Sequence, residues 1–327
     1  MRYRTLGRTG LEVSELGFGC GNVGGLMVRG DRETRVRAAA RAIELGVTFF
    51  DTAPGYGNLR SEAHLGQALE ELGADVLVGT KVRLGAADVE RIGEAVVESV
   101  EGSLKRLRRE RVDLIQLHNQ IVTRRQPNRG ALGVGDVEEV LRAFQALHVQ
   151  GKVRFWGITG LGDTEAVHRV IDAGEMYTTQ TCFNLINPTA GVQAPQGFPF
   201  QDYGQLIDRA AGQGMGVIVI RVLAAGALSG TADRHPVAAP SVGPIGSGAD
   251  YGEDVARAQS CRFLVDEGHA GSLVEAAIRF ALSKAEVSTT LVGLSSLEQL
   301  EQAVEYAAKG PLPGEALARL QEVWAGW

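Results

Sequence analysis

The feature that most constrains the fold is an alternation of short apolar runs with longer segments of helical periodicity. Eight runs rich in β-branched or apolar residues, typical of buried strands, end near Phe18, Phe50, Gly79, Leu117, Ile158, Gln180, Ile220 and Val292. Most neighbouring runs are separated by a segment whose apolar residues advance by three or four, as in 88–108 and 136–149, which predicts a helix with one buried face. Eight strands that alternate with helices over roughly 250 residues or more predict an α/β fold, the closed parallel (β/α)8 TIM barrel.

Residues 3–14 precede this pattern and contain two short extended runs around Gly7 and Gly10, which predict an N-terminal β-hairpin. No internal repeat and no interdomain linker interrupts the chain of 327 residues. We therefore expect a single barrel domain over residues 1–327.

Three long irregular stretches, about 119–135, 185–201 and 222–250, all follow strands. In a TIM barrel such loops lie on the catalytic face, so we expect them to shape the substrate pocket. Trp324 and Trp327 in the C-terminal tail could close that pocket or could pack the last helix.

Composition narrows the class of partner. The net charge of -6 and a pI of about 5.6 give no broad attraction for phosphate backbones, so we expect no nucleic-acid partner. The longest apolar runs are strand-length, and the chain begins without an apolar signal core, so we expect a cytoplasmic protein without a membrane anchor. Three widely separated cysteines, outside any CxxC spacing, predict neither a disulfide framework nor a zinc site. The oligomeric state is not predicted.

Polar side chains follow three successive strands at the point where each strand meets its loop. Asp51 and Lys81 follow the second and third strands, His118 follows the fourth, and Tyr56 lies in the loop five residues after Asp51. Taken singly, each residue could be structural. Because the carboxyl ends of barrel strands surround one mouth, we expect the four side chains to converge there.

The four side chains together can transfer a proton. A free tyrosine has a pKa of about 10, and a nearby Lys81 ammonium would lower it. Asp51 would keep the buried Lys81 charged, because a carboxylate within reach favours the protonated amine. A neutral His118 imidazole could bond the substrate oxygen and align the carbonyl. The other histidines lack such a setting, no HxH or HExxH spacing occurs, and we predict no metal.

The segments FFDTAPGYG, GTK and QLHN carry these residues, and they occur with RTLGRTGLEVSELGFG and KVRFWGITGL in a fixed order. Together they resemble the aldo-keto reductases from about residue 2 to about residue 305. The resemblance implies hydride transfer between NAD(P)H and a carbonyl or alcohol substrate, such as an aldehyde, ketone or aldose. It also implies that Asp51, Tyr56, Lys81 and His118 form the catalytic tetrad, with Tyr56 as the general acid and base.

The resemblance also implies a set of cofactor contacts: Gly19, Asp51, Thr159, Gln180, Arg221, Leu223, Gly293, Ser295, Ser296 and Gln299. Two positions depart from the family pattern. The Ser-Asn pair that holds the nicotinamide carboxamide is replaced by Thr159 and Gly160, so one side-chain contact is lost. Arg221 stands where a serine is common; it could reach the pyrophosphate or could pair with an acidic neighbour.

The segment Leu291–Val304 favours NAD over NADP. Many family members carry Lys or Arg here to hold the 2′-phosphate of NADP, whereas this stretch has no basic residue and carries Glu298 and Glu301. Ser295 and Ser296 could hold the pyrophosphate or ribose at a helix N-terminus. The ITGL and VGLSS segments are most similar to the sugar-dehydrogenase (L-galactose type) branch, which also implies NAD and a sugar or related hydroxyl substrate.

Two alternatives remain. Gly19, Gly21 and Gly24 spell GxGxxG after the first strand, as in a Rossmann fold, but the next helix begins only near Asp31, too far from the third glycine for that motif. The second alternative is a non-catalytic nucleotide-binding regulatory subunit of the same fold, because the family includes ion-channel accessory subunits. Nucleotide binding without turnover would favour it.

Overall fold

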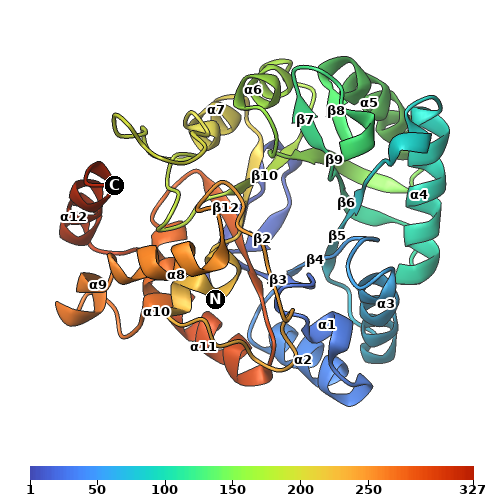
Figure 1. The fold of residues 1–327 in the computed structure, drawn as a ribbon. Helices are drawn as coiled ribbons and strands as arrows, with labels where there is room; N and C mark the ends of the chain where they lie inside the picture. Colours follow the sequence, from blue (N-terminus) through green and yellow to red (C-terminus); the bar gives the residue numbers. More distant parts are fainter.

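The computed structural model describes all residues from 1 to 327 and contains a closed barrel of parallel strands surrounded by helices (Figure 1). The barrel strands are β3 (Leu16–Gly19), β4 (Phe49–Asp51), β5 (Leu77–Val82), β6 (Val112–Leu117), β9 (Val153–Thr159), β10 (Thr178–Cys182), β11 (Gly216–Ile220) and β12 (Val287–Gly293). Strand β12 pairs with β3 and closes the cylinder, with Val292 opposite Phe18. The predicted TIM barrel is confirmed.

Each barrel strand is followed by a helix that covers it. The covering helices are α2 (Arg32–Glu44), α3 (Arg60–Leu72), α4 (Ile92–Leu107), α5 (Val134–Val149), α6 (Thr164–Asp172), α7 (Leu206–Gly212), α10 (Leu273–Ala281) and α11 (Leu297–Ala308). Helix α4 buries Ile92, Val96, Val100, Leu104 and Leu107, the apolar face that its periodicity predicts. Helix α12 (Gly314–Ala325) packs outside this ring, and the short helices α1 (Leu26–Arg29), α8 (Tyr251–Gln259) and α9 (Phe263–Asp266) lie in connections.

The predicted N-terminal hairpin is present and closes one end of the barrel. Strands β1 (Tyr3–Thr5) and β2 (Glu12–Ser14) pair antiparallel. Leu6, Leu11 and Val13 are buried in one cluster with inward-facing residues of β4, β6, β11 and β12. Because the hairpin fills this end with apolar side chains, only the opposite end of the barrel can hold a polar site.

Two boundaries differ from the sequence expectations. Strand β5 continues to Val82, so Lys81 lies inside the strand and faces the barrel interior, not the following loop. The stretch 119–135 is only partly irregular, because β7 (Gln120–Val122) and β8 (Ala131–Gly133) pair within it. No helix in the structure is both long enough and apolar enough to span a membrane.

Candidate active site

The structure brings Asp51, Tyr56, Lys81 and His118 together at the open end of the barrel. The Lys81 ammonium donates to Asp51 Oδ2 and, at 2.8 Å, to the Thr52 carbonyl oxygen. Both members of this ion pair are buried, with side chains 1% and 5% exposed. Burial alone lowers the pKa of Lys81, but the charge of Asp51 opposes it, and the pKa of Lys81 is raised above its usual value. Lys81 therefore remains an ammonium ion inside the barrel.

Asp51 is held by a second strand as well. The Gln180 side-chain amide on β10 donates to Asp51 Oδ1 at 2.7 Å, so the carboxylate links β4, β5 and β10 across the barrel mouth. Gln180 is among the cofactor contacts that the family resemblance implies. In this structure its amide nitrogen donates to Asp51, and the side chain also lines the adjoining cavity.

Tyr56 lies beside the Lys81 ammonium and the His118 ring. Lys81 Nζ is 4.8 Å from the centre of the Tyr56 ring, and the ring centres of Tyr56 and His118 are 5.9 Å apart in an edge-to-face arrangement. Burial raises the pKa of Tyr56, and the charge of Lys81 opposes this without overcoming it. Lys81 thus acts in the direction that the sequence analysis expects, but the net shift is upward, and Tyr56 carries its proton at neutral pH.

His118 is neutral at physiological pH. Burial lowers its pKa to about 3, and the charges of Lys81 and Arg83 contribute in the same direction. A neutral imidazole has one N–H donor and one acceptor nitrogen, so His118 can donate to a substrate oxygen without carrying a charge into the site.

A cavity of about 540 Å³ runs from the tetrad to helix α11. Of the predicted cofactor contacts, it is lined by Gly19, Asp51, Gln180, Arg221, Leu223, Gly293, Ser295 and Gln299. Thr159 and Ser296 do not line it. Thr159 is fully buried and its hydroxyl has no hydrogen-bond partner, whereas Ser296 caps α11 by accepting from the Gln299 backbone N–H at 3.3 Å.

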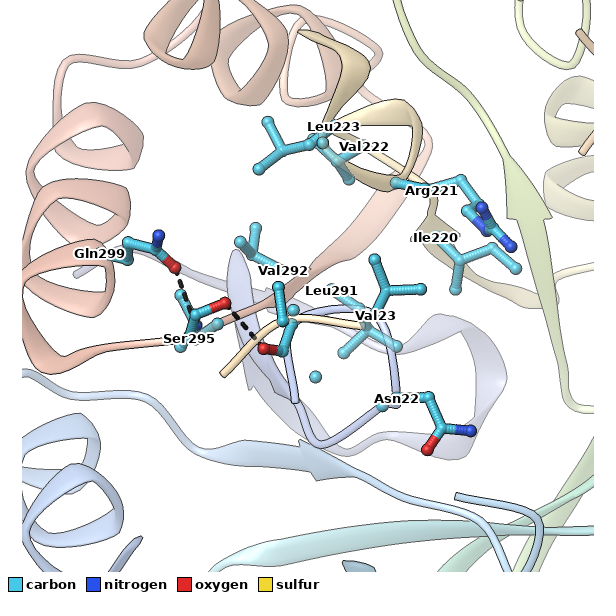
Figure 2. A pocket seen from close by; sticks show the side chains of 18 of the residues that line it. Asn22, Val23, Ile220, Arg221, Val222, Leu223, Leu291, Val292, Ser295 and Gln299 are labelled. Atoms are coloured by element: carbon cyan, nitrogen blue, oxygen red, sulfur yellow. Dashed lines mark hydrogen bonds between the residues drawn. The ribbon is translucent and has the colours of Figure 1, made fainter. Parts of the chain in front are cut away.

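Ser295, which is predicted to hold the pyrophosphate or ribose, already bonds to protein atoms on both sides (Figure 2). Ser295 Oγ donates to the Gly24 carbonyl oxygen at 2.7 Å, and the Ser295 backbone N–H donates to Gln299 Oε1 at 2.8 Å. The close approach requires glycine at position 24, because a Cβ there would overlap the backbone of Leu294. A bound anion would replace these protein contacts at the N-terminus of α11.

The structure adds cavity residues that the sequence analysis missed. Of the three long loops, only 222–250 lines the cavity, and it contributes Asp233, Arg234 and His235. The Arg234 guanidinium donates to the carbonyl oxygens of Ala225 at 2.8 Å and Ala239 at 2.6 Å and lies over the Tyr251 ring. No local pattern marks these residues, because the fold of a long loop decides which side chains face inward.

The C-terminal tryptophans do not line this cavity. Trp324 is buried against Phe280, and its indole N–H donates to the Leu185 carbonyl oxygen at 2.9 Å. Trp327 packs against Phe198 and Phe200. Both side chains therefore pack against the protein and do not close the pocket.

Arg221 takes up an unusual backbone conformation on the cavity wall. Its φ is 58°, in the left-handed region, and its carbonyl oxygen accepts from the Asn184 side chain at 2.9 Å. The guanidinium donates to the Gly243 carbonyl oxygen at 3.2 Å and forms no ion pair with an acidic neighbour. The arginine therefore keeps donors free on the side of the cavity that includes Ile220 (Figure 2).

Comparison with known proteins identifies the family of this chain. A model of the Aldo/keto reductase family matches residues 15–325. The chain belongs to the aldo/keto reductase family. Among its relatives, an L-galactose dehydrogenase from Arabidopsis thaliana is 30% identical over 333 residues, covering 99% of this chain and 94% of that protein. A probable voltage-gated potassium channel subunit beta from Oryza sativa is 28% identical, covering 74% of this chain and 70% of that protein.

Solved structures of the family share the fold. The holo form of aldo-keto reductase AKR11C1 from Bacillus halodurans superposes with a TM-score of 0.73 at 24% identity, covering 99% of this chain and 96% of that chain. Membership in the aldo/keto reductase family supports the assignment of the chain as an NAD(P)-dependent oxidoreductase for carbonyl compounds.

Proposed function

We propose that the chain transfers a hydride between a nicotinamide cofactor and a carbonyl or alcohol carbon, with Tyr56 as the proton donor and acceptor. The observation that carries this proposal is the buried Lys81–Asp51 ion pair beside Tyr56, at one end of a long cavity. A buried ion pair of this kind contributes little stability compared with apolar packing, so a chemical role accounts for it better.

The residues divide the chemistry between them. The nicotinamide, when bound, supplies or accepts the hydride. Tyr56 Oη gives its proton to the carbonyl oxygen during reduction, and His118 donates a hydrogen bond to the same oxygen. Lys81 stabilises the phenolate that forms, because its ammonium lies 4.8 Å from the Tyr56 ring centre and is kept charged by Asp51. Because Tyr56 is protonated at neutral pH, the site is set for reduction; oxidation requires its conjugate base.

The residues present fit a nicotinamide dinucleotide. Thr159 has a buried hydroxyl without a partner, and such a group is satisfied by a polar ligand more readily than by solvent. Of the residues that line the cavity, Gln180 would hold the carboxamide, and Ser295 and Gln299 would hold the pyrophosphate and ribose. Thr159 and Ser296 lie outside this lining, so their contacts with the nucleotide would require the site to rearrange on binding. Gly19, Gly293, Arg221 and Leu223 would form the walls between these ends.

We propose NAD as the preferred nucleotide. The stretch 291–304 has no basic residue, and Glu301 pairs with Arg41 at 2.7 Å on the surface. Arg234 reaches the cavity from the loop 222–250, and its guanidinium donates to two carbonyl oxygens of that loop. The segment 291–304 itself therefore offers no cation to a 2′-phosphate, whereas a 2′-hydroxyl needs none.

For the substrate we propose a hydroxylated carbonyl compound or its alcohol, of the aldose class. The support is the full-length similarity to a protein named L-galactose dehydrogenase. The substrate class is tested separately from the reaction class, with a panel that includes aldoses, their sugar alcohols and unsubstituted aldehydes.

The deciding experiment titrates NADH and NADPH into the purified protein and into Tyr56→Phe, then measures turnover of the panel. We expect NADH to bind more tightly than NADPH, and Tyr56→Phe to keep nucleotide binding while losing turnover. Tyr3→Phe is the matched control, because Tyr3 is exposed on β1. Full turnover by Tyr56→Phe would refute the proton role, and a lack of nucleotide binding would refute the cofactor assignment.

A second candidate is a nucleotide-binding regulatory subunit. The observation in its favour is the similarity to several proteins named as potassium channel beta subunits. Nucleotide binding without turnover of any compound in the panel would support this function over the enzymatic one.

A further inference from the structure

We propose that Asn22 is a positioning residue for Tyr56. Asn22 lies in the connection between β3 and α1 and lines the cavity, apart from the Ser295 and Gln299 cluster (Figure 2). Its side chain forms hydrogen bonds with the residues directly before and after the tyrosine. Oδ1 accepts from the Gly57 backbone N–H at 2.7 Å, and Nδ2 donates to the Gly55 carbonyl oxygen at 3.4 Å. The inference rests on the proposed proton role of Tyr56.

The loop that carries Tyr56 needs such a restraint. Gly57, Asn58 and Leu59 follow the tyrosine with φ values of 62°, 52° and 73°, three successive left-handed residues of which two are not glycine. Asparagine tolerates this conformation better than most residues, but leucine does not, so the backbone is strained. A strained backbone persists only where surrounding contacts hold it in place. Asn22 supplies one such contact, because its Oδ1 accepts from the N–H of Gly57, the first of these three residues.

The neighbours of Asn22 contact the same loop. A Cβ on Gly21 would lie 3.7 Å from Tyr56 Cε2, an ordinary van der Waals distance, so Gly21 lies directly beside the tyrosine ring. A Cβ on Gly57 would overlap the Val28 side chain on α1, so the loop is seated directly on this helix. The segment 21–28 therefore forms the surface on which the Tyr56 loop rests, and Asn22 provides its side-chain hydrogen bonds.

Arg29 holds Asn22 from the other side. The Arg29 guanidinium donates to the Asn22 carbonyl oxygen at 2.5 Å and to the Val237 carbonyl oxygen at 2.6 Å. The Ala239 backbone N–H donates to the Val23 carbonyl oxygen at 3.0 Å. The cavity-lining loop 222–250 is thus attached to the backbone of Asn22, whose side chain is attached to the Tyr56 loop.

The role predicts a loss in the chemical step and not in binding. Asn22→Ala removes both side-chain bonds, and a displacement of a catalytic group by about 1 Å costs about 10²-fold in rate. With NADH and glyceraldehyde as probes, we expect kcat to fall by about that factor while KM and the NADH dissociation constant stay near their wild-type values. Asn22→Asp keeps an oxygen acceptor for the Gly57 N–H and should recover most of kcat. Asn128→Ala, at an exposed asparagine outside the site, is the matched control.

A double-mutant cycle distinguishes positioning from a general structural role. If Asn22 acts through the Tyr56 hydroxyl, Asn22→Ala should cause no further loss in the Tyr56→Phe background. Multiplicative losses, or a large fall in melting temperature for Asn22→Ala, would overturn the inference. If the rate of Tyr56→Phe is too low to measure, two other results test the positioning role. These are a fall in kcat without a change in KM for Asn22→Ala, and the recovery of kcat by Asn22→Asp.

The two proposals fail separately. If Tyr56→Phe turns over at the wild-type rate, the proposed function fails. If Tyr56→Phe is inactive while Asn22→Ala is fully active, the proposed function stands and only the role of Asn22 is wrong. Should Asn22→Ala not fold, Asn22→Ser, whose hydroxyl is one atom closer to the backbone, carries the same expectation.

Discussion

Removal of the Asp51 charge tests the central ion pair of the site. Asp51→Asn keeps the size of the side chain but leaves the Lys81 ammonium without its carboxylate partner, so that only neutral oxygens, such as the Thr52 carbonyl, remain close to it. Both side chains of the pair are almost fully buried, so water cannot replace the lost charge. An ion that loses its partner in such a site costs about 3–5 kcal/mol. At about 2 °C per kcal/mol for a chain of this size, the melting temperature should fall by about 6–10 °C at pH 7.

The pH dependence of this loss identifies its cause. In the wild-type protein the folded-state pKa of Lys81 is raised, so its contribution to stability is fully present below the unfolded pKa of about 10.4 and is lost only as pH rises through the folded value. In Asp51→Asn, burial acts without the opposing carboxylate, and the folded pKa falls below the unfolded one. The unfolded variant then binds more protons, so its stability rises with pH.

Thermal melts of both proteins between pH 7 and pH 10 provide the assay. The difference in melting temperature should shrink as pH rises, because Lys81 in the folded variant loses its proton within this range. Asp51→Asn/Lys81→Met removes both charges and should be more stable than Asp51→Asn alone. A difference that does not change with pH, or a double variant no more stable than the single one, would refute the explanation.

Three further predictions follow from individual contacts. Burial raises the pKa of Tyr56, so the rate of carbonyl reduction should stay level through neutral pH and fall only above about pH 10. The rate of alcohol oxidation should rise above about pH 10. A fall in the reduction rate between pH 6 and pH 8 would indicate that another group is the acid. Thr159→Val removes a buried hydroxyl that has no hydrogen-bond partner, so the melting temperature should not fall. The affinity for NADH should weaken by about 0.5–1.5 kcal/mol, the contribution of one hydrogen bond. An unchanged NADH affinity in a titration would exclude the contact between Thr159 and the carboxamide. Gly24→Ala places a Cβ against the Leu294 backbone, so the cavity should distort and both thermal stability and nucleotide binding should fall; a wild-type melt would contradict the observed close approach.

Local patterns along the chain are enough to predict the barrel and to single out the residues proposed for the tetrad. Strand and helix periodicity are local properties of the chain, and their regular alternation leaves few architectures that bury every apolar face. Polar residues at the ends of apolar runs are visible for the same reason, so Asp51, Lys81 and His118 stand out without any knowledge of tertiary contacts. The end of β5 differs from the expectation, because Lys81 interrupts the apolar pattern while remaining inside the strand.

The hydrogen-bond partners in the site, and the balance between burial and charge there, depend on contacts between segments far apart in the chain. Gln180 reaches Asp51 across the barrel, and Asn22 reaches the Tyr56 loop from a different connection; no sequence spacing encodes either contact. The direction of the Tyr56 pKa shift also required the structure, because the attraction to Lys81 and the cost of burial have opposite signs and only their geometry determines which is larger. The same holds for long loops, because contacts with distant parts of the chain decide whether a loop residue faces the cavity or solvent. Arg234 therefore lines the cavity although the sequence does not predict it, whereas neither C-terminal tryptophan lines it.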